Sequence, residues 1–390
     1  MIVNKKIVIC DVNIQQNGHY IGYNQFVIDN YKRVLGGAVG DELIFVYNIE
    51  AKELLRFPED AQTIFLDFKA DLVDTLSGRT QIWKMVLSAI EGLKADMLYF
   101  LDLDKFQIPV SLYKGTTSIS TIYFRPHHRT VPSNNKLKTV VNTKIKSLKK
   151  IFSEVIVIGL NKNVKNIFIL NDPSGVAHLN KFYRTEKFKH LPDPIFSYDT
   201  ESQSEILEKD KSEISLLAFG ALAERKNTEN IIRAYSVAKF SQPTVLKIIG
   251  SSKPAYFSTI SRLVEEVKNN LAPNKRIILE NKFVSNAEMD ELHATSHISL
   301  LIYKDFFGSS GLLGRSAKHN MYVLASSVGL IQELVNKYNL GKTTDPFDVN
   351  QIAQAMEQAQ NEYSHFNTDG CKRFYEEHQP DQFLKSLFLQ

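Results

Sequence analysis

The sequence predicts an α/β protein made of two doubly wound, Rossmann-like domains with ligands at the carboxyl ends of their strands. The chain has 390 residues, which suits two domains of roughly 100–200 residues each. Apolar residues make up 43% of it and charged residues 23%, the balance of a globular protein. Short apolar runs alternate with amphipathic stretches along both halves, and this order is typical of βαβ units around a parallel sheet.

In the first half, apolar runs predict strands at Lys6–Cys10, Glu42–Tyr47, Thr63–Leu66, Asp96–Leu101, Ile119–Phe124 and Val155–Ile158. Helices are expected at Tyr23–Leu35, Gln81–Leu93 and Lys136–Phe152, where apolar residues recur at three- and four-residue spacing. Phe182–Phe196 is irregular and basic, and the polar stretch Ser197–Ser212 has almost no core pattern. We therefore expect a first domain over residues 1–196 and a linker over 197–212.

The second half repeats the alternation. Strands are expected at Ser215–Phe219, Thr244–Ile249, Arg276–Leu279, Ile298–Ile302 and Tyr322–Ala325, and helices at Thr228–Ala238, Tyr256–Asn269, Ile331–Tyr338 and Gln351–Ala359. Ser285 with Glu288 predicts a capped helix through Ala294, and Asp348 with Gln351 predicts another cap. The second domain is placed at 213–370, and a C-terminal helix at 371–390, broken at Pro380, is expected to pack on the first domain.

The two cysteines, Cys10 and Cys371, match no metal or redox spacing, so we expect free thiols in a reducing compartment. No stretch is apolar for long enough to form a signal peptide core or to span a membrane. These observations predict a cytoplasmic protein.

Positive charge is concentrated in one part of the chain. Between Lys105 and Lys150 there are ten lysines and arginines and no acidic residue: Lys105, Lys114, Arg125, Arg129, Lys136, Lys138, Lys144, Lys146, Lys149 and Lys150. Such a surface suits an anionic partner, either acceptor phosphates or the inner face of an anionic membrane. The helix Lys136–Phe152 carries an apolar stripe, for which we favour packing on the protein's own sheet over contact with a membrane: Leu137, Val141, Ile145, Leu148 and Phe152.

The stretch Ser299–Ser326 reads as strand, tight turn, short helix and strand. Its turn, Gly308-Ser309-Ser310-Gly311, offers two glycines able to take positive φ angles, two hydroxyls and the free N–H groups of the following helix. This combination predicts an anion site, because aligned N–H groups and the helix dipole favour a phosphate. The alternative is an ordinary turn with Ser310 as the N-cap.

A second turn should reach the same edge of the second sheet. Gly220 follows a predicted strand, and Arg225 and Lys226 precede the next helix. Two cations suit phosphate oxygens whose negative charge grows as a leaving group departs. The alternative is a surface ion pair with Glu224.

The chain from Phe219 to Gly341 resembles the donor half of family-four retaining glycosyltransferases, which have the GT-B fold of two facing Rossmann-like domains. The matching segments are FGALAERKN, LKIIGSS, FVSNAEMDELHATSHISLLIY and DFFGSSGLLGRSAKHNMYVLASSVGLIQELV. The resemblance implies that Arg225 and Lys226 hold a nucleotide diphosphate and that Gly220 and the turn Gly308–Gly311 complete the donor site. The family motif carries two glutamates, and here they are replaced by Asp305, the implied sugar contact, and Leu313.

The first half resembles the family more weakly. Asn17–Gly22 looks like its glycine loop, so the resemblance implies that Gly18 approaches the donor and His19 the acceptor. Arg125-Pro126-His127-His128-Arg129 follows a predicted strand where the family often places a histidine near the donor sugar. On this basis His127 is the catalytic candidate, while Arg125, His128 and Arg129 are candidates for binding an acceptor or an anionic surface. The alternative is a basic loop with no chemistry.

The pair Asp102 and Asp104 supports an alternative interpretation, because an Asp-x-Asp holds the cation in metal-dependent GT-A glycosyltransferases. We judge it structural or acceptor-side, since a GT-A protein would leave the second set of strands unexplained. The resemblance thus implies a metal-independent, cofactor-independent transferase that moves a sugar, with retention at the anomeric carbon, from a nucleotide-sugar to a glycan or lipid-linked glycan in cell-surface polysaccharide synthesis, with no nucleic-acid partner. An inactive binding module and a nucleotide-sugar epimerase remain the alternatives.

Overall fold

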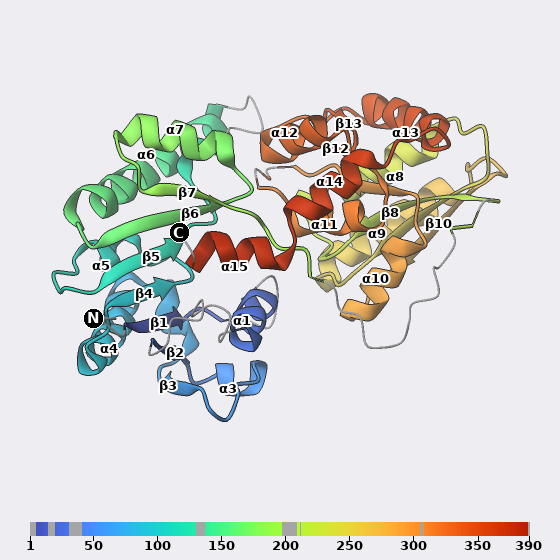
Figure 1. Cartoon of the computed structure of the whole chain (residues 1–390). Helices are drawn as coiled ribbons and strands as arrows, with labels where there is room; N and C mark the ends of the chain where they lie inside the picture. Colours follow the sequence, from blue (N-terminus) through green and yellow to red (C-terminus); the bar gives the residue numbers. More distant parts are fainter. Residues whose placement is uncertain are drawn as a thin grey trace. The chain divides into compact units, whose positions relative to one another are not determined.

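The structure is a computed structural model that describes residues 5–14, 20–30, 41–129, 137–196, 209–210, 212–304, 306 and 308–388, without the side chains of 20, 137–147 and 160. The chain divides into two compact units (Figure 1). The first contains Met1–Pro194 together with Pro380–Gln390, and the second contains Ile195–Gln379. Most of the predicted linker therefore lies outside the described residues.

The first unit is built on a parallel sheet of seven strands in the order β3-β2-β1-β4-β5-β6-β7. The strands are β1 (Lys6–Asp11), β2 (Glu42–Asn48), β3 (Gln62–Leu66), β4 (Met97–Phe100), β5 (Ser118–Ile122), β6 (Val164–Leu170) and β7 (Phe188–Leu191). The order reverses between β1 and β4, so the carboxyl ends of these two strands border the topological switch point where such sheets bind ligands.

Helices cover both faces of this sheet. One apolar core joins it to α4 (Leu76–Leu93), α5 (Gln107–Ser111), α6 (Leu137–Leu160) and α7 (Pro173–Tyr183). The other joins it to α1 (Tyr20–Asp29), α3 (Ala51–Leu54) and α15 (Pro380–Phe388). The short 3-10 helices are η1 (Ala70–Asp74) and η2 (His127–Arg129). In α15, Phe383 stacks on Tyr23 with ring centroids 5.5 Å apart, and Phe388 contacts Tyr99 at 4.6 Å, so the chain from Pro380 onward belongs to the first unit. The preceding part of the predicted C-terminal helix, in α14, packs in the second unit.

The second unit has a parallel sheet of six strands in the order β10-β9-β8-β11-β12-β13. They are β8 (Ile214–Phe219), β9 (Thr244–Ile249), β10 (Lys275–Glu280), β11 (Ile298–Leu301), β12 (Tyr322–Ser326) and β13 (Gly341–Thr344). One face packs against α8 (Thr228–Val237), α9 (Pro254–Lys268) and α13 (Val349–Tyr363), and the other against α11 (Gly311–Lys318), α12 (Gly329–Tyr338) and α14 (Asp369–Glu377). The remaining elements are η3 (Glu224–Lys226) and α10 (Asn286–Ala294). Here the switch point lies between β8 and β11.

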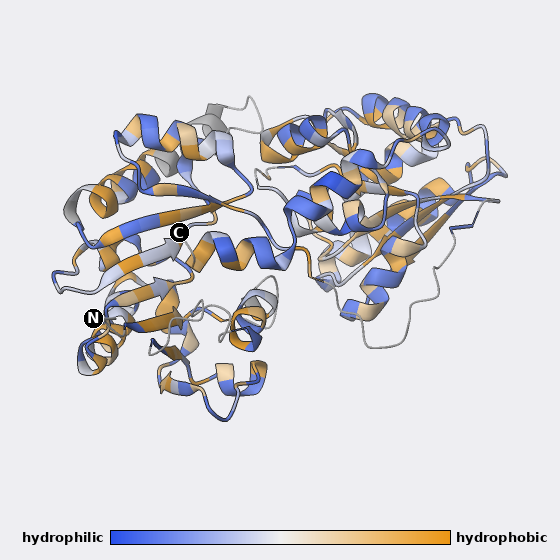
Figure 2. Ribbon diagram, viewed as in Figure 1, coloured by the Kyte–Doolittle hydropathy of each residue, from blue (hydrophilic) through white to orange (hydrophobic). Residues whose placement is uncertain are grey.

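Apolar residues colour much of the central strands, whereas the helices carry both apolar and polar residues (Figure 2). Both predicted caps are confirmed. The Ser285 hydroxyl accepts a hydrogen bond from the Glu288 N–H at 3.2 Å, and the Asp348 carboxylate accepts one from the Gln351 N–H at 3.1 Å. These caps satisfy N–H groups that the helices α10 and α13 leave without intrahelical partners.

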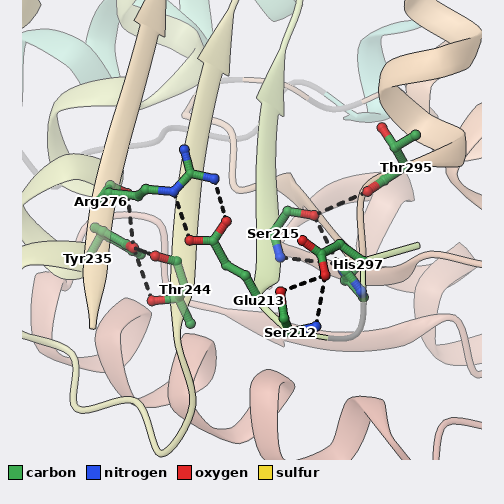
Figure 3. Close-up of polar contacts among 9 residues, drawn as sticks. Ser212, Glu213, Ser215, Tyr235, Thr244, Arg276, Thr295 and His297 are labelled. Atoms are coloured by element: carbon green, nitrogen blue, oxygen red, sulfur yellow. Dashed lines mark hydrogen bonds and ion pairs between the residues drawn. The ribbon is translucent and has the colours of Figure 1, made fainter. Parts of the chain in front are cut away.

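Polar side chains near the amino ends of β8 and β11 are bonded within the fold (Figure 3). The Ser215 N–H donates to His297 Nδ1 at 3.1 Å, and the Tyr235 hydroxyl donates to the Thr244 carbonyl at 2.8 Å. Arg276 forms an ion pair with Glu213. These groups hold neighbouring segments together, and the opposite, carboxyl edge of the sheet is the one where doubly wound sheets bind ligands.

Four parts of the strand prediction are wrong. Val155–Ile158 is not a strand but lies within α6, because its apolar residues continue a helical turn. The strand β6, which follows α6, was not predicted although its sequence VKNIFIL contains an apolar run, and neither β7 nor β13 was predicted. The sequence of β7 is FKHL and that of β13 is GKTT, so neither carries an apolar run. The thiols of Cys10 and Cys371 are free and buried, as expected.

Candidate active site

Two glycines shape the carboxyl end of β8. Gly220 has a φ angle of 104°, which strongly favours glycine, and a Cβ atom added there would lie 3.5 Å from Lys226 Nζ. Gly250, at the end of β9, has a φ angle of 152°, and a Cβ atom there would lie only 1.9 Å from the Gly220 carbonyl oxygen. The two strand ends can therefore approach closely, with the Lys226 ammonium beside them.

A chain of hydrogen bonds joins the two turns that the sequence singled out. Lys226 Nζ donates to the Tyr303 hydroxyl at 2.9 Å and to the Phe219 carbonyl at 3.3 Å, and it lies 4.2 Å from the centre of the Tyr303 ring. The Tyr303 hydroxyl lies 3.3 Å from Ser310 Oγ. Tyr303, which follows β11, thus connects the cation after β8 to the start of α11.

Arg225 lies beside Lys226 but is exposed. Its guanidinium stands 5.6 Å from the centre of the Phe306 ring, and its carbonyl accepts a hydrogen bond from the Lys304 N–H at 2.8 Å. Arg225 and Lys304 also line a cavity of about 330 Å³. Among the ion pairs of the described residues, none joins Glu224 to Arg225 or Lys226, so both cations remain able to meet an anionic ligand.

The turn before α11 differs in detail from the expectation. Ser310, not Gly308 or Gly311, takes the positive φ angle, with φ 63° and ψ 117°. Ser310 occupies the N-cap position without a side-chain cap bond, and its carbonyl accepts the Leu313 N–H at 2.9 Å. Ser309 is 8% exposed, and no atom lies within 4 Å of a Cβ built on Gly311. The start of α11 therefore offers backbone N–H groups to an anion with no side chain at Gly311 in the way.

Leu313 takes no part in this surface. Its side chain is fully buried in the core between α11 and the sheet, so it supplies no ribose contact. Its neighbour Leu312 faces the turn instead, since Leu312 Cδ1 would lie 3.8 Å from a Cβ on Gly220. Asp305, the expected sugar contact, lies outside the described residues.

In the first unit, His127 is buried in a hydrogen-bonded cluster after β5. Its Nδ1 lies 2.6 Å from Glu154 Oε2, and the same carboxylate accepts the Tyr123 and Tyr183 hydroxyls, each at 2.6 Å. Burial alone would raise the pKa of Glu154, but the hydrogen bonds from His127 and the two tyrosines outweigh it and lower the pKa. Glu154 thus fixes the orientation of the His127 ring, as carboxylates commonly do for functional histidines.

The other members of the predicted basic loop have intramolecular partners. His128 Nε2 lies 3.0 Å from Asp172 Oδ2, and the Arg129 guanidinium donates to the same carboxylate at 2.8 Å. Burial opposes ionisation of Asp172, yet the bonds from Arg129 and His128 hold its pKa well below the usual range. Arg125 is exposed, with Nε 3.5 Å from Asp104. An acceptor would have to compete with Asp172 for His128 and Arg129.

The Asp102–Asp104 pair lies at the switch point of the first sheet, but both carboxylates bind neighbouring segments. Asp102 accepts the Asn13 amide at 2.7 Å and the Asp104 N–H at 3.0 Å. Asp104 accepts the Phe124 N–H at 2.7 Å. Within the described residues, no group of three or more His, Cys, Asp or Glu side chains is arranged to hold a metal ion. Both carboxylates thus hold neighbouring segments of the first unit together, as the structural interpretation expects.

Two further predicted residues, Gly18 and His19, lie outside the described residues. The sequence reasoning missed Tyr303, Glu154 and Asp172, and only the three-dimensional contacts identify them. A cavity of about 720 Å³ in the first unit is lined by Lys5, Lys94 and Lys165 among others and lies at the amino edge of the sheet, away from these groups.

By architecture, the two doubly wound units define a GT-B protein, as predicted. Solved structures of this fold match nearly the whole chain: a glycosyltransferase from Rickettsia africae (TM-score 0.64, 13% identity, 98% of this chain and 96% of that one) and sucrose-phosphate synthase from Thermosynechococcus elongatus (TM-score 0.62, 15% identity, 99% and 95%). WaaG, a glycosyltransferase involved in lipopolysaccharide biosynthesis, matches with a TM-score of 0.61 at 16% identity over 97% of each chain.

By sequence, no protein-family model and no curated protein matches the chain. The structural neighbours include trehalose-phosphate synthases as well as WaaG, so they share the GT-B fold without placing the chain in family four. Several are recorded with nucleotide ligands, among them HepE from Anabaena in complex with UDP and glucose (TM-score 0.58, 11% identity, 99% of this chain and 96% of that one). At these identities, the likeness establishes the fold alone.

Proposed function

We propose that this protein is a glycosyltransferase that transfers a sugar from a nucleotide-sugar donor to a glycan or lipid-linked glycan. The observation that carries the proposal is the Lys226–Tyr303–Ser310 chain at the carboxyl edge of β8 and β11. A cation, hydroxyls and a helix N-terminus converge at the switch point of a GT-B unit, where a nucleotide diphosphate would bind. HepE, whose structure holds UDP and glucose, is a neighbour of the same fold.

The groups at this edge suit the departure of a diphosphate. As the bond between the sugar and the diphosphate breaks, negative charge grows on the phosphate oxygens, and Lys226, Arg225 and the N–H groups at the start of α11 would stabilise it. The positive end of the α11 dipole adds to the same effect. No metal ion and no cofactor is required in this scheme. We propose retention at the anomeric carbon and no covalent nucleophile, with Asp305 and His127 as the sugar-side candidates.

The setting we propose is cell-surface polysaccharide synthesis at the cytoplasmic face of an anionic membrane. WaaG, a structural neighbour, acts in lipopolysaccharide biosynthesis. In the parts of the chain that the structure describes, no helix is long and apolar enough to cross a membrane.

Release of nucleoside diphosphate from a panel of nucleotide-sugars, measured with and without glycan acceptors, tests the proposal. A transferase releases the diphosphate and joins the sugar to an acceptor, and NMR of the product reports the anomeric configuration. A nucleotide-sugar epimerase, the second candidate, would yield a changed nucleotide-sugar without any acceptor. If the protein bound nucleotide-sugars but turned over none of them, it would be an inactive binding module, and the proposal would be contradicted.

A further inference from the structure

An apolar stripe lies on the outer face of α6. Leu148 and Phe152 are each 64% exposed, and Val155 is 49% exposed. They stand at positions i, i+4 and i+7 of one helix, so they line a single face. The expectation that the stripe of this helix packs on its own sheet is therefore wrong for its described members.

The opposite face of α6 is the one that holds the helix to the first unit. Glu154 is 3% exposed in the His127 cluster, and Val157 is 1% exposed in the core. The Asn161 amide, just after the helix, donates to the Val110 carbonyl in α5 at 2.6 Å. Because α6 is already anchored on this side, Leu148, Phe152 and Val155 are available to another surface.

The charge around the stripe has one sign. The only acid in α6 is Glu154, which is buried, so the outer face of the helix carries no carboxylate. Lys149 is exposed beside Leu148, whereas Lys150 is partly buried and donates to the Arg125 carbonyl at 2.8 Å. An apolar face flanked by lysine and free of carboxylates is complementary to the interface of an anionic bilayer.

We infer that α6 docks in the interface of an anionic lipid bilayer, with Leu148, Phe152 and Val155 inserted among the lipids. This inference deepens the proposed function, on which it rests, by assigning the membrane contact to apolar insertion at α6. The broader basic interval contributes less than its composition suggests. Three of its cations are paired with acids of the protein: Lys105 with Asp74, Arg125 with Asp104, and Arg129 with Asp172.

A tryptophan placed in the stripe reports insertion directly. The native Trp83 is 3% exposed in the core, so its emission should not respond to lipid. In Phe152→Trp, we expect a blue shift with vesicles of mixed phosphatidylglycerol and phosphatidylcholine, and quenching by lipids brominated along their acyl chains, because interfacial helices bury their apolar face about 5–10 Å deep. An unchanged spectrum with anionic vesicles would overturn the inference.

Co-sedimentation with the same vesicles provides a second test of membrane binding. Leu148→Gln/Phe152→Gln should bind at least about tenfold more weakly than wild type, because each apolar side chain gains free energy on leaving water. Val237→Gln, which alters a residue 56% exposed on α8, is the matched control and should bind like wild type. If the stripe variant bound vesicles as well as wild type, the inference would be contradicted. It would also be contradicted if analytical sedimentation showed that the stripe joins two copies of the chain. Both variants should still bind nucleoside diphosphate. A protein that failed to bind it would contradict the proposed function and not the membrane contact of α6.

Discussion

At the scale of single residues, the Lys226 ammonium is held in position without a ligand. The Tyr303 hydroxyl and the Phe219 carbonyl accept its hydrogen bonds, and the Tyr303 ring lies beneath it. Tyr303 is itself fixed, since it is 1% exposed and its carbonyl accepts the Ser326 hydroxyl at 2.6 Å. A cation fixed in advance costs little reorganisation when negative charge develops beside it.

Replacing Tyr303 with phenylalanine should weaken diphosphate binding while sparing the fold. The ring remains, but Lys226 and Ser310 lose their common partner, so we expect about threefold to tenfold weaker binding of a nucleoside diphosphate. Calorimetric titration measures it. Tyr322→Phe is the control, because that hydroxyl bonds to Glu362 at 2.8 Å at the other end of the sheet. Similar losses in both variants would contradict a local role for Tyr303.

Asp104 should make the stability of the first unit depend on pH. Burial raises its pKa to about 7, with a further contribution from the nearby Asp102 carboxylate. The folded state therefore retains a proton between about pH 4 and pH 7 that the unfolded chain has lost, so stability falls as the pH rises through this window.

Urea denaturation at pH 5 and pH 8 tests this expectation. Wild type should lose stability between the two values, and Asp104→Asn, which can still accept the Phe124 N–H, should lose less, by on the order of 1 kcal/mol. The exposed Asp71→Asn should behave like wild type. An identical pH dependence in Asp104→Asn and wild type would show that Asp104 ionises normally.

At the scale of elements, the start of α11 combines a strained residue with the phosphate-binding role that we propose for it. Ser310 has a φ angle of 63°, a conformation that costs a non-glycine residue about 1–3 kcal/mol and is concentrated at functional sites. Ser310→Gly should therefore be about 1 kcal/mol more stable than Ser310→Ala, which keeps the strain and loses the contact with Tyr303. Thermal unfolding compares the two. If Ser310→Ala were the more stable, the turn would carry no strain.

The elements also show which features of the fold cannot be predicted from sequence periodicity alone. The caps at Ser285 and Asp348 were predictable because capping depends on neighbouring residues only. The orientation of α6 could not be predicted, because Leu148 and Phe152 have the same spacing whether they face a sheet or solvent. The strand β13, Gly341–Thr344, has no apolar residue, and only its pairing with β12 defines it.

At the scale of the whole molecule, the alternation of strands and helices was enough to predict two parallel sheets, because βαβ order restricts the topology strongly. The sequence also predicted that Lys226 and Ser310 would share one edge, since both follow strands that border the switch point. It could not identify Tyr303 as their link or Glu154 as the partner of His127, because those contacts join residues 77 and 27 positions apart.

We expect that turnover does not require a divalent ion. Lys226, Arg225 and the helix terminus supply positive charge at the phosphates, which is the work a metal ion does in other transferases. Donor turnover should persist after treatment with a chelator and should not rise when magnesium is restored. Loss of activity in chelator, with recovery on adding magnesium or manganese, would contradict this expectation and favour a metal site at Asp102 and Asp104.

The most direct test of the central claim is calorimetric titration of nucleoside diphosphates and the matching nucleosides into wild type and Arg225→Ala/Lys226→Ala. We expect wild type to bind one diphosphate at least about tenfold more tightly than its nucleoside, and the double variant to lose that difference, because the two cations act on the phosphates. Nucleoside binding itself should change little. Equal losses for diphosphate and nucleoside, or no preference for the diphosphate in wild type, would contradict a phosphate site at the ends of β8 and β11.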